Sequence, residues 1–293
     1  MKSSWIKIFF KSIVTGRNIA LCLLAFLLLL PTKICSMELE PGEEDLKVSI
    51  KNQWAGKKIA FLGDSMTDKR HVGTTKCYWE YLAEMLGFEA FSYGVNGNQM
   101  KHLIAQADKL REEHGRDIDA IVIFAGTNDY NSSIPIGSWY EEVYRNVPLE
   151  NGKVGSRRYR QLVMSDETFC GRVNRLMNYL KCHFPTKQII ILTPLHRGFA
   201  QFGINNVQPE EAYPNKIGIY VDEYIQMLKE AGNVWAVPVI DLNSISGLYP
   251  MNDAQTLYFH KADTDRLHPN ALGHRRMAMA LMYQLLAFPA NFE

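Results

Sequence analysis

The chain contains little cysteine, and its cysteines follow neither a metal-binding nor a disulfide pattern. Five of the 293 residues are cysteine, and only Cys77, Cys170 and Cys182 follow residue 36. These three are odd in number and contain no C-x-x-C pair, which argues against a disulfide scaffold and a zinc knuckle. We therefore expect all three to be packing residues.

Net charge is also small. The 32 Lys and Arg residues against 31 Asp and Glu residues leave +1 for the whole chain. Residues 1–36 contain five basic and no acidic side chains, so residues 37–293 carry 27 basic and 31 acidic side chains, a net charge of −4. Because a weakly acidic body lacks the basic surface that nucleic-acid binding requires, we expect no nucleic-acid partner.

No apolar run is long enough for a comfortable membrane span. The run from Ile19 to Leu30 has 12 residues and follows basic residues; as a helix it spans about 18 Å, against about 30 Å of hydrocarbon. This pattern predicts a signal peptide over residues 1–36 and export to the periplasm, the cell surface or the medium. An uncleaved N-terminal anchor and a lipid on Cys35 are the alternatives, and Ile34 disfavours the lipid. The oligomeric state stays open.

After an acidic lead-in over residues 37–55, short apolar runs alternate with longer amphipathic segments. The short runs are rich in β-branched and aromatic residues, which predicts buried strands; they cover residues 57–63, 89–94, 120–126, 188–194 and 237–242. Apolar residues at helical spacing predict helices over residues 77–86, 166–184, 213–231 and 270–286. Such alternation predicts one α/β domain over residues 56–293, with a parallel sheet covered by helices on both faces.

Two connections are too long to be simple turns, residues 131–164 and 195–212. Both follow predicted strands, and ligands of open α/β sheets bind at the carboxyl ends of the strands. We expect both insertions to contact substrate, with solvated decoration as the alternative. The first insertion carries a basic cluster that suits either an anionic group or solvent, Arg157, Arg158 and Arg160. The second carries the best candidates for specificity, His196 and Arg197.

Ser65 follows the first predicted strand directly, in the segment Gly63–Asp68. A strand that passes into a helix there would expose the hydroxyl at the carboxyl edge of the sheet, near free backbone N–H groups. A nucleophilic serine needs such exposure and a base within about 3 Å. By itself a serine at such a position is more commonly a helix N-cap.

Polar residues also follow the second and third predicted strands. Gly94 and Gly97 come after the second strand and could turn backbone N–H groups toward a ligand. Asn128 comes after the third strand, where its amide can point at a developing oxyanion. Ordinary turn roles would explain each of these residues alone.

The last candidate segment lies near the C-terminus. His268 precedes Pro269, which can open the last helix at its first position. Asp265, three residues earlier, could accept a hydrogen bond from one ring nitrogen and leave the other free to take a proton from Ser65. Asp263 competes for the orienting role, but the three-residue spacing favours Asp265.

Together these four segments resemble the SGNH hydrolase superfamily, also called GDSL esterases and lipases. The resemblance covers nearly all of residues 57–287, with Met66 where leucine is commoner, and its matching segments are Gly63–Ser65, Gly97, Gly126–Asp129 and Asp265–His268. It implies a flavodoxin-like three-layer α/β/α sandwich with a five-stranded parallel sheet.

The resemblance also implies a role for each matching residue. Ser65 would be the nucleophile, His268 the general base, and Asp265 the group that orients the imidazole. The oxyanion hole would consist of the backbone N–H groups of Ser65 and Gly97 and the side-chain amide of Asn128.

The expected function is that of an exported serine esterase for small acyl esters, with an acyl-serine intermediate and O-acetylated carbohydrate as the favoured substrate. Neither a metal nor an organic cofactor is expected. A lysophospholipase or lipase, and a non-catalytic carbohydrate-binding protein on the same fold, are the alternatives. A metal cluster of His260, Asp263, Asp265 and His268 could be imagined, but the chain contains no H-E-x-x-H motif to support it.

Overall fold

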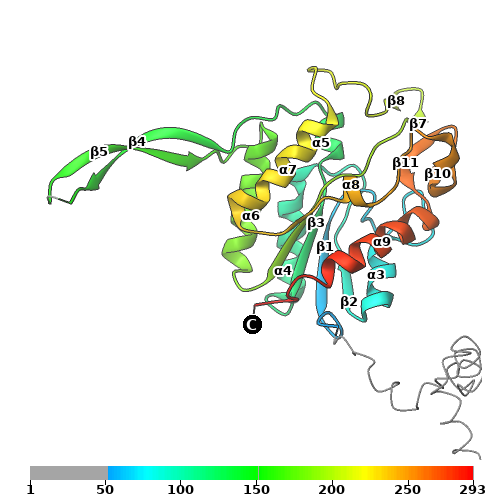
Figure 1. The fold of residues 1–293 in the computed structure, drawn as a ribbon, viewed down its shortest axis with the longest axis horizontal. Coiled ribbons are helices and arrows are strands. Elements are labelled where there is room, and N and C mark those ends of the chain that lie inside the picture. Colours follow the sequence, from blue (N-terminus) through cyan, green and yellow to red (C-terminus); the bar gives the residue numbers. More distant parts are fainter. Residues whose placement is uncertain (1–51, 151, 293) are drawn as a thin grey trace, which may run out of the picture. The chain divides into compact units, whose positions relative to one another are not determined.

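A computed structural model describes residues 52–150 and 152–292 of the chain (Figure 1). The predicted signal peptide and residues 37–51 of the lead-in lie outside the described residues. At the centre is a five-stranded sheet in the order β2-β1-β3-β6-β9, and all neighbouring strands are parallel. Its strands are β1 (Lys58–Gly63), β2 (Glu89–Ser92), β3 (Ala120–Phe124), β6 (Gln188–Leu192) and β9 (Val239–Ile240). The five predicted strands are therefore confirmed, and their order is the flavodoxin-like one.

The helices lie on both faces of this sheet. The five long ones are α3 (Tyr78–Leu86), α4 (Leu103–His114), α6 (Phe169–His183), α7 (Val221–Trp235) and α9 (Ala271–Leu285). Because successive strand residues point to opposite faces, Ala60 and Leu62 of β1 pack with α4, α6 and α7, whereas Ile59 and Phe61 pack with α3 and α9. This arrangement confirms the three-layer α/β/α sandwich.

Strands β3 and β6 are buried along their whole length. Their sequences, AIVIF and QIIIL, are apolar apart from Gln188 because both faces of the sheet are covered. The register pairs Ile121 with Ile189 and Ile123 with Ile191. This core fixes the carboxyl ends of the strands, from which the functional loops leave.

Two helices differ from the sequence-based expectation. Helix α4 was not among the predicted helices, and α7 begins at Val221 instead of residue 213. Residues 213–219 form turns because Asn215 accepts hydrogen bonds from the backbone N–H groups of Ile217 and Ile219 through its side-chain oxygen. Such Asx turns compete with helix formation.

A small antiparallel sheet, which was not predicted, joins the second insertion to the segment of His268. Its order is β10-β11-β7-β8, formed by β10 (Phe259–Lys261), β11 (Asp265–Pro269), β7 (Ala200–Gly203) and β8 (Asn206–Gln208). Pro269 therefore ends a strand, and the expectation that it opens the last helix is wrong. Asn270 caps α9 instead, because its side chain accepts from the N–H groups of Leu272 and Gly273.

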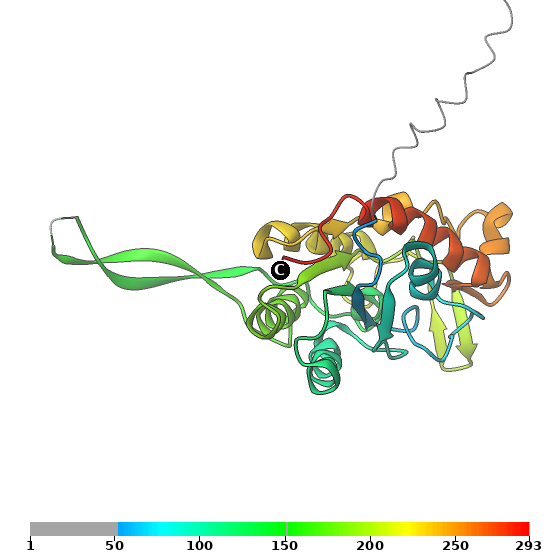
Figure 2. The ribbon, with the colours of Figure 1, turned by 90° about the horizontal axis from the view of Figure 1, so that it is seen from below.

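The first insertion forms a long hairpin of β4 (Tyr140–Pro148) and β5 (Val154–Leu162). In both views it extends away from the sandwich (Figures 1 and 2). Its base is held by Asn174 of α6, whose side-chain amide donates to the carbonyl oxygens of Trp139 and Val163. Beyond this base, most hairpin residues are exposed.

The remaining elements are single turns that join the layers. They are η2 (Met100–His102), α5 (Thr127–Asn131), α8 (Leu242–Ile245) and η3 (Asp253–Tyr258). None of the helices in residues 52–150 and 152–292 is long and apolar enough to cross a membrane.

The packed domain begins before residue 56, so the lead-in predicted to end at residue 55 is too long. Trp54 is fully buried, and its indole N–H donates to the carbonyl oxygen of Leu285 at 2.7 Å. Among the cysteines, Cys77 and Cys170 are buried, whereas Cys182 is exposed and is not the packing residue that was expected.

Gly63 provides a test of close packing at the end of β1. A Cβ there would lie 2.5 Å from Thr67 Oγ1 and 2.6 Å from the carbonyl oxygen of Phe124. Because the neighbouring strand cannot move away freely, we expect Gly63→Ala to lower the free energy of unfolding by about 1–3 kcal/mol in urea denaturation. In Gly203→Ala, the matched control, the new Cβ meets no atom within 4 Å. An equal loss in the two variants would contradict the packing argument.

Candidate active site

Ser65 lies in a tight turn directly after β1. The backbone N–H of Thr67 donates to the carbonyl oxygen of Asp64 at 3.1 Å, and turns continue until α3 begins at Tyr78. The predicted passage from strand to helix at Ser65 is therefore wrong. The serine is 5% exposed.

His268 connects this turn to an acidic residue. Its Nε2 lies 2.9 Å from Ser65 Oγ, and its Nδ1 lies 3.0 Å from Asp265 Oδ2. An ionised carboxylate only accepts hydrogen bonds, so Nδ1 carries the proton and Nε2 accepts from the serine hydroxyl. Burial alone would raise the pKa of Asp265, but the hydrogen bond and charge of His268 outweigh it, and the pKa lies below its usual value.

The small antiparallel sheet holds the imidazole in place. Asp265 pairs with Ala200 of β7, and its side chain accepts from the backbone N–H groups of Leu267 and His268. The ring of Phe202 lies 5.4 Å from that of His268. The second insertion therefore supports His268 directly, and Asp265 contacts the ring.

Asn128 joins the serine turn to the loop that follows β2. Its Nδ2 donates to the carbonyl oxygen of Asn98 at 3.1 Å and to Asp64 Oδ2 at 3.4 Å. Asn98 follows Gly97, whose φ of +81° favours glycine. Within the described residues, the backbone N–H of Gly97 donates to no protein acceptor. The structure thus brings Asn128 beside the chain neighbours of both Ser65 and Gly97.

A buried ion pair that was not predicted fixes the same loop. Arg172 of α6 donates to Asp129 Oδ1 at 2.8 Å and to the side chain of Gln99, while Asp129 Oδ2 accepts from the N–H of Met100. Burial raises the pKa of Asp129 despite these partners. Asp129 lies within Gly126–Asp129, a segment that matches the family. No local sequence pattern indicates Arg172, because its partner is 43 residues away in the chain.

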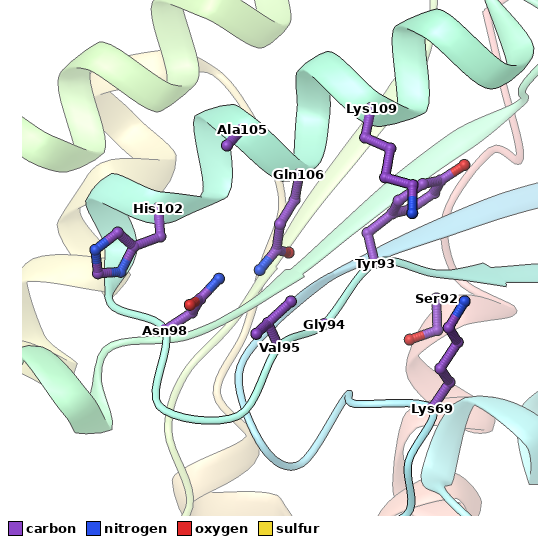
Figure 3. Close-up of a pocket in the computed structure, with 10 residues that line it drawn as sticks. All are labelled: Lys69, Ser92, Tyr93, Gly94, Val95, Asn98, His102, Ala105, Gln106 and Lys109. Atoms are coloured by element: carbon purple, nitrogen blue, oxygen red, sulfur yellow. The ribbon is translucent and has the colours of Figure 1, made fainter.

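Gln106 of α4, also not predicted, holds the end of β1. Its side chain accepts from the N–H of Gly63 and donates to the carbonyl oxygen of the same residue. Gln106 and Asn98 both line a pocket between α4 and the loop after β2 (Figure 3). The pocket is therefore adjacent to the residues that fix the serine and Asn128 loops.

The two specificity candidates of the second insertion differ in exposure. Arg197 is buried, and its guanidinium donates to Thr127 Oγ1 at 2.8 Å and to the side chain of Gln208. Burial lowers the pKa of Arg197 to about 10. Arg197 therefore fixes the insertion to α5, and its expected substrate contact is wrong. His196 is partly exposed and lies 2.7 Å from Glu211, which raises the pKa of the histidine.

Most of the first insertion forms the projecting hairpin β4–β5. Its hairpin extends away from the sandwich (Figure 2), and its arginines contact its own residues: Arg158 pairs with Glu142, and Arg160 lies over the ring of Tyr140. Residues 132 and 134, before the hairpin, instead bond to Gln99 and Asp129 near the site, and the expected contact of this insertion with substrate stays a prediction. The long connection folds as a self-contained ribbon because its strands pair with each other.

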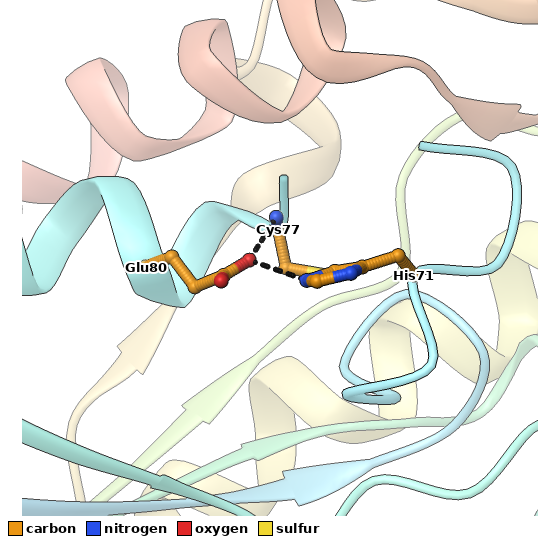
Figure 4. Close-up of side chains that lie close together, drawn as sticks. All are labelled: His71, Cys77 and Glu80. Atoms are coloured by element: carbon orange, nitrogen blue, oxygen red, sulfur yellow. Dashed lines mark hydrogen bonds and ion pairs between the residues drawn. The ribbon is translucent and has the colours of Figure 1, made fainter. Parts of the chain in front are cut away.

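Across the described residues, the potential metal ligands that cluster are His71, Cys77 and Glu80, not those around His268 (Figure 4). Glu80 Oε2 accepts from the backbone N–H of Cys77 at 2.6 Å and pairs with His71 at 2.8 Å. This is the cap of α3. Burial, with the nearby Glu80 charge, raises the pKa of the Cys77 thiol to about 12, which opposes the thiolate that metals bind.

Asp64 provides a pH-dependent test of the serine turn. Burial raises its pKa from 3.8 to about 7. The folded protein then holds a proton that the unfolded chain has lost, so the free energy of unfolding falls as the pH rises from about 4 to about 7 and levels off above. We expect Asp64→Asn to lack this decline in urea denaturation between pH 4 and 8. If the free energy of unfolding depended on pH in the same way for the wild type and the variant, the raised pKa of the Asp64 carboxyl would be contradicted.

The GDSL-like lipase/acylhydrolase family matches residues 61–276 of this sequence. No curated protein matches it significantly. Among solved structures, a protein of Lactobacillus plantarum is similar at 24% identity and a TM-score of 0.61, over 79% of this chain and 97% of that one. A protein of Chitinophaga pinensis, described as a possible lipase, has 18% identity and a TM-score of 0.57, over 78% and 97% of the two chains. These two solved structures share the fold of this chain, and the family match spans the segments from Ser65 to His268. The chain therefore belongs to the GDSL-like lipase/acylhydrolase family.

Proposed function

We propose that the protein is an exported serine esterase that hydrolyses small acyl esters, with O-acetyl groups on carbohydrate as the favoured substrate. Family membership supports ester hydrolysis as the reaction class. The observation that carries the proposal is the 2.9 Å contact between Ser65 Oγ and His268 Nε2, continued by Asp265. A non-catalytic binding protein would not need this chain of three side chains.

The geometry suits a two-step acyl transfer. Ser65 Oγ bonds to the ester carbonyl carbon while its proton passes to His268 Nε2, and Asp265 stabilises the imidazolium. The proton then passes to the alcohol oxygen as the carbon–oxygen bond breaks, which leaves an acyl-serine. Water attacks this ester with the same base, releases the carboxylic acid and restores Ser65.

The negative charge of each tetrahedral intermediate needs donors that are already in position. The backbone N–H groups of Ser65 and Gly97 and the amide of Asn128 are the proposed donors. The amide of Asn128 lies beside the serine turn and donates to Asn98 and Asp64, so one of these hydrogen bonds must give way when the amide donates to the oxyanion. Loss of one such donor costs on the order of 3 kcal/mol of transition-state stabilisation in other serine hydrolases.

The small, mostly apolar cavity lined by Asp64, Met66, Thr127 and Leu267, among others, is not lined by Ser65 and gives no information on the acyl group. The pocket of Figure 3 favours a second candidate function. It is lined in part by Tyr93, Val95 and Ala105, and such apolar side chains would suit the longer acyl chain of a lipase or lysophospholipase substrate.

Export is proposed from residues 1–36, whose basic start and 12-residue apolar run resemble a signal peptide. A lipid on Cys35 or a retained anchor would place the same esterase at a membrane surface. In each case the substrate is an ester outside the cytoplasm, which agrees with a glycan.

Ser65→Ala and His268→Ala test the nucleophile and the base. We expect each to lower kcat/KM for p-nitrophenyl acetate by about 10³-fold or more, because the residues act as one unit. Ser244→Ala and His183→Ala, on α8 and at the end of α6, are the matched controls and should retain full activity. Equal product release by the wild type and Ser65→Ala would remove the esterase proposal.

Acyl-chain length tests the substrate class. We expect p-nitrophenyl acetate to be cleaved faster than the octanoate, because the proposed natural substrate is an O-acetyl ester. Acetate released from acetylated polysaccharides, measured with Ser65→Ala as the blank, then identifies the glycan. A large preference for octanoate would exclude the acetylesterase and favour the lipase candidate.

A further inference from the structure

The hairpin β4–β5 has two long strands and no third strand beside them. It forms a separate two-stranded sheet in the described chain, so the outer edge of each strand is unpaired. An isolated two-stranded hairpin is marginally stable in water. Large side chains on it are also exposed, with Tyr144 at 72% and Val154 at 71%. Such an edge readily pairs with another strand.

The hydrogen bonds at both ends of the hairpin show which backbone groups face outward. The N–H of Leu149 donates to the carbonyl of Lys153, and that of Val163 to the carbonyl of Trp139. Hydrogen-bonded pairs alternate in an antiparallel ladder, so the odd-numbered residues of β4 bond to β5. The N–H and C=O groups of the even-numbered residues therefore lie along the free edge: Tyr140, Glu142, Tyr144 and Asn146.

The outer edge of β5 is unsuited to pairing with itself. The strand carries Arg157, Arg158 and Arg160. A two-fold axis at any position from 157 to 160 places one arginine directly opposite another, and like charges in opposed positions destabilise a sheet. Charged edges of this kind oppose association.

The outer edge of β4 is self-complementary in one register. A two-fold axis at Val143 places Glu141 of each copy opposite Arg145 of the other copy, twice, with Val143 opposite Val143. These are non-hydrogen-bonded pairs, in which opposed side chains are closest. An axis at Glu142 opposes two glutamates, an axis at Arg145 opposes two arginines, and an axis at Tyr144 brings no opposite charges together.

We propose that β4 pairs antiparallel with β4 of a second copy of this chain across a two-fold axis at Val143. The product is a four-stranded ribbon whose outer edges are the two arginine-bearing β5 strands. The pairing satisfies the free backbone groups of β4 and explains why the hairpin extends from the sandwich (Figure 1). It does not depend on the proposed esterase activity.

A charge exchange tests both the dimer and its register. In Glu141→Arg, arginine opposes Arg145 twice, and in Arg145→Glu, glutamate opposes Glu141 twice. We expect each single variant to raise the dimer Kd at least about tenfold in analytical ultracentrifugation. The double variant Glu141→Arg/Arg145→Glu should return the Kd to within about threefold of wild type, because both pairs are restored with reversed sign.

Glu150→Arg, in the turn of the hairpin, is the control for a simple change in net charge and should leave the Kd near that of wild type. A protein that stays monomeric up to about 100 μM would overturn the proposal and leave the ribbon to a different partner. A double variant as weak as the two singles would overturn it as well.

A cross-link tests the axis directly. Opposed residues of a non-hydrogen-bonded pair lie within disulfide distance. In a Cys182→Ser background, which removes the exposed cysteine of the described residues, we expect Val143→Cys to form an intermolecular disulfide under mild oxidation. Val147→Cys, on the same strand, should not, because it would face Trp139 of the second copy. Equal cross-linking at both positions would contradict the register.

Discussion

The site depends on the hydrogen bond between Ser65 Oγ and His268 Nε2, which joins segments 203 residues apart in the chain. Each end of this bond is held by different contacts. Gln106 holds Gly63 at the end of β1, two residues before the serine, and the pairing of Asp265 with Ala200 holds β11. In the proposed mechanism a proton moves between these two atoms, so small shifts of either support would cost activity.

Buried polar side chains give the loops of the site their rigidity. Arg172 and Asp129 fix the loop after β2 to α5 and α6, and Arg197 fixes the second insertion to Thr127. Removing one partner from such a pair leaves an unsatisfied charge in the interior, which is strongly destabilising. These groups act on the reaction through position, since none contacts the serine in the described structure.

The strands of the hairpin differ from those of the sandwich in residue type and in burial. The core strands β3 and β6 are apolar apart from Gln188 and are covered by both layers of helices, whereas β4 and β5 carry charged and aromatic residues with little burial. Charge in the core would oppose folding; on a free edge it selects which strands can pair and in which register. The same chain thus contains the covered α/β/α sandwich and an exposed hairpin. The outer edges of the two hairpin strands differ in whether they can pair with a copy of themselves.

The sequence by itself determined the five core strands, their parallel arrangement and the order of the serine, glycine, asparagine and histidine segments, because apolar periodicity and short motifs are local signals. It could not determine the small sheet that supports His268, since its strands have three to five residues and exist only through pairing with distant segments. Nor could it show that Arg197 is buried or that residues 140–162 form a projecting hairpin. Burial and direction in space depend on contacts between residues far apart in the chain, and only the tertiary structure decided them.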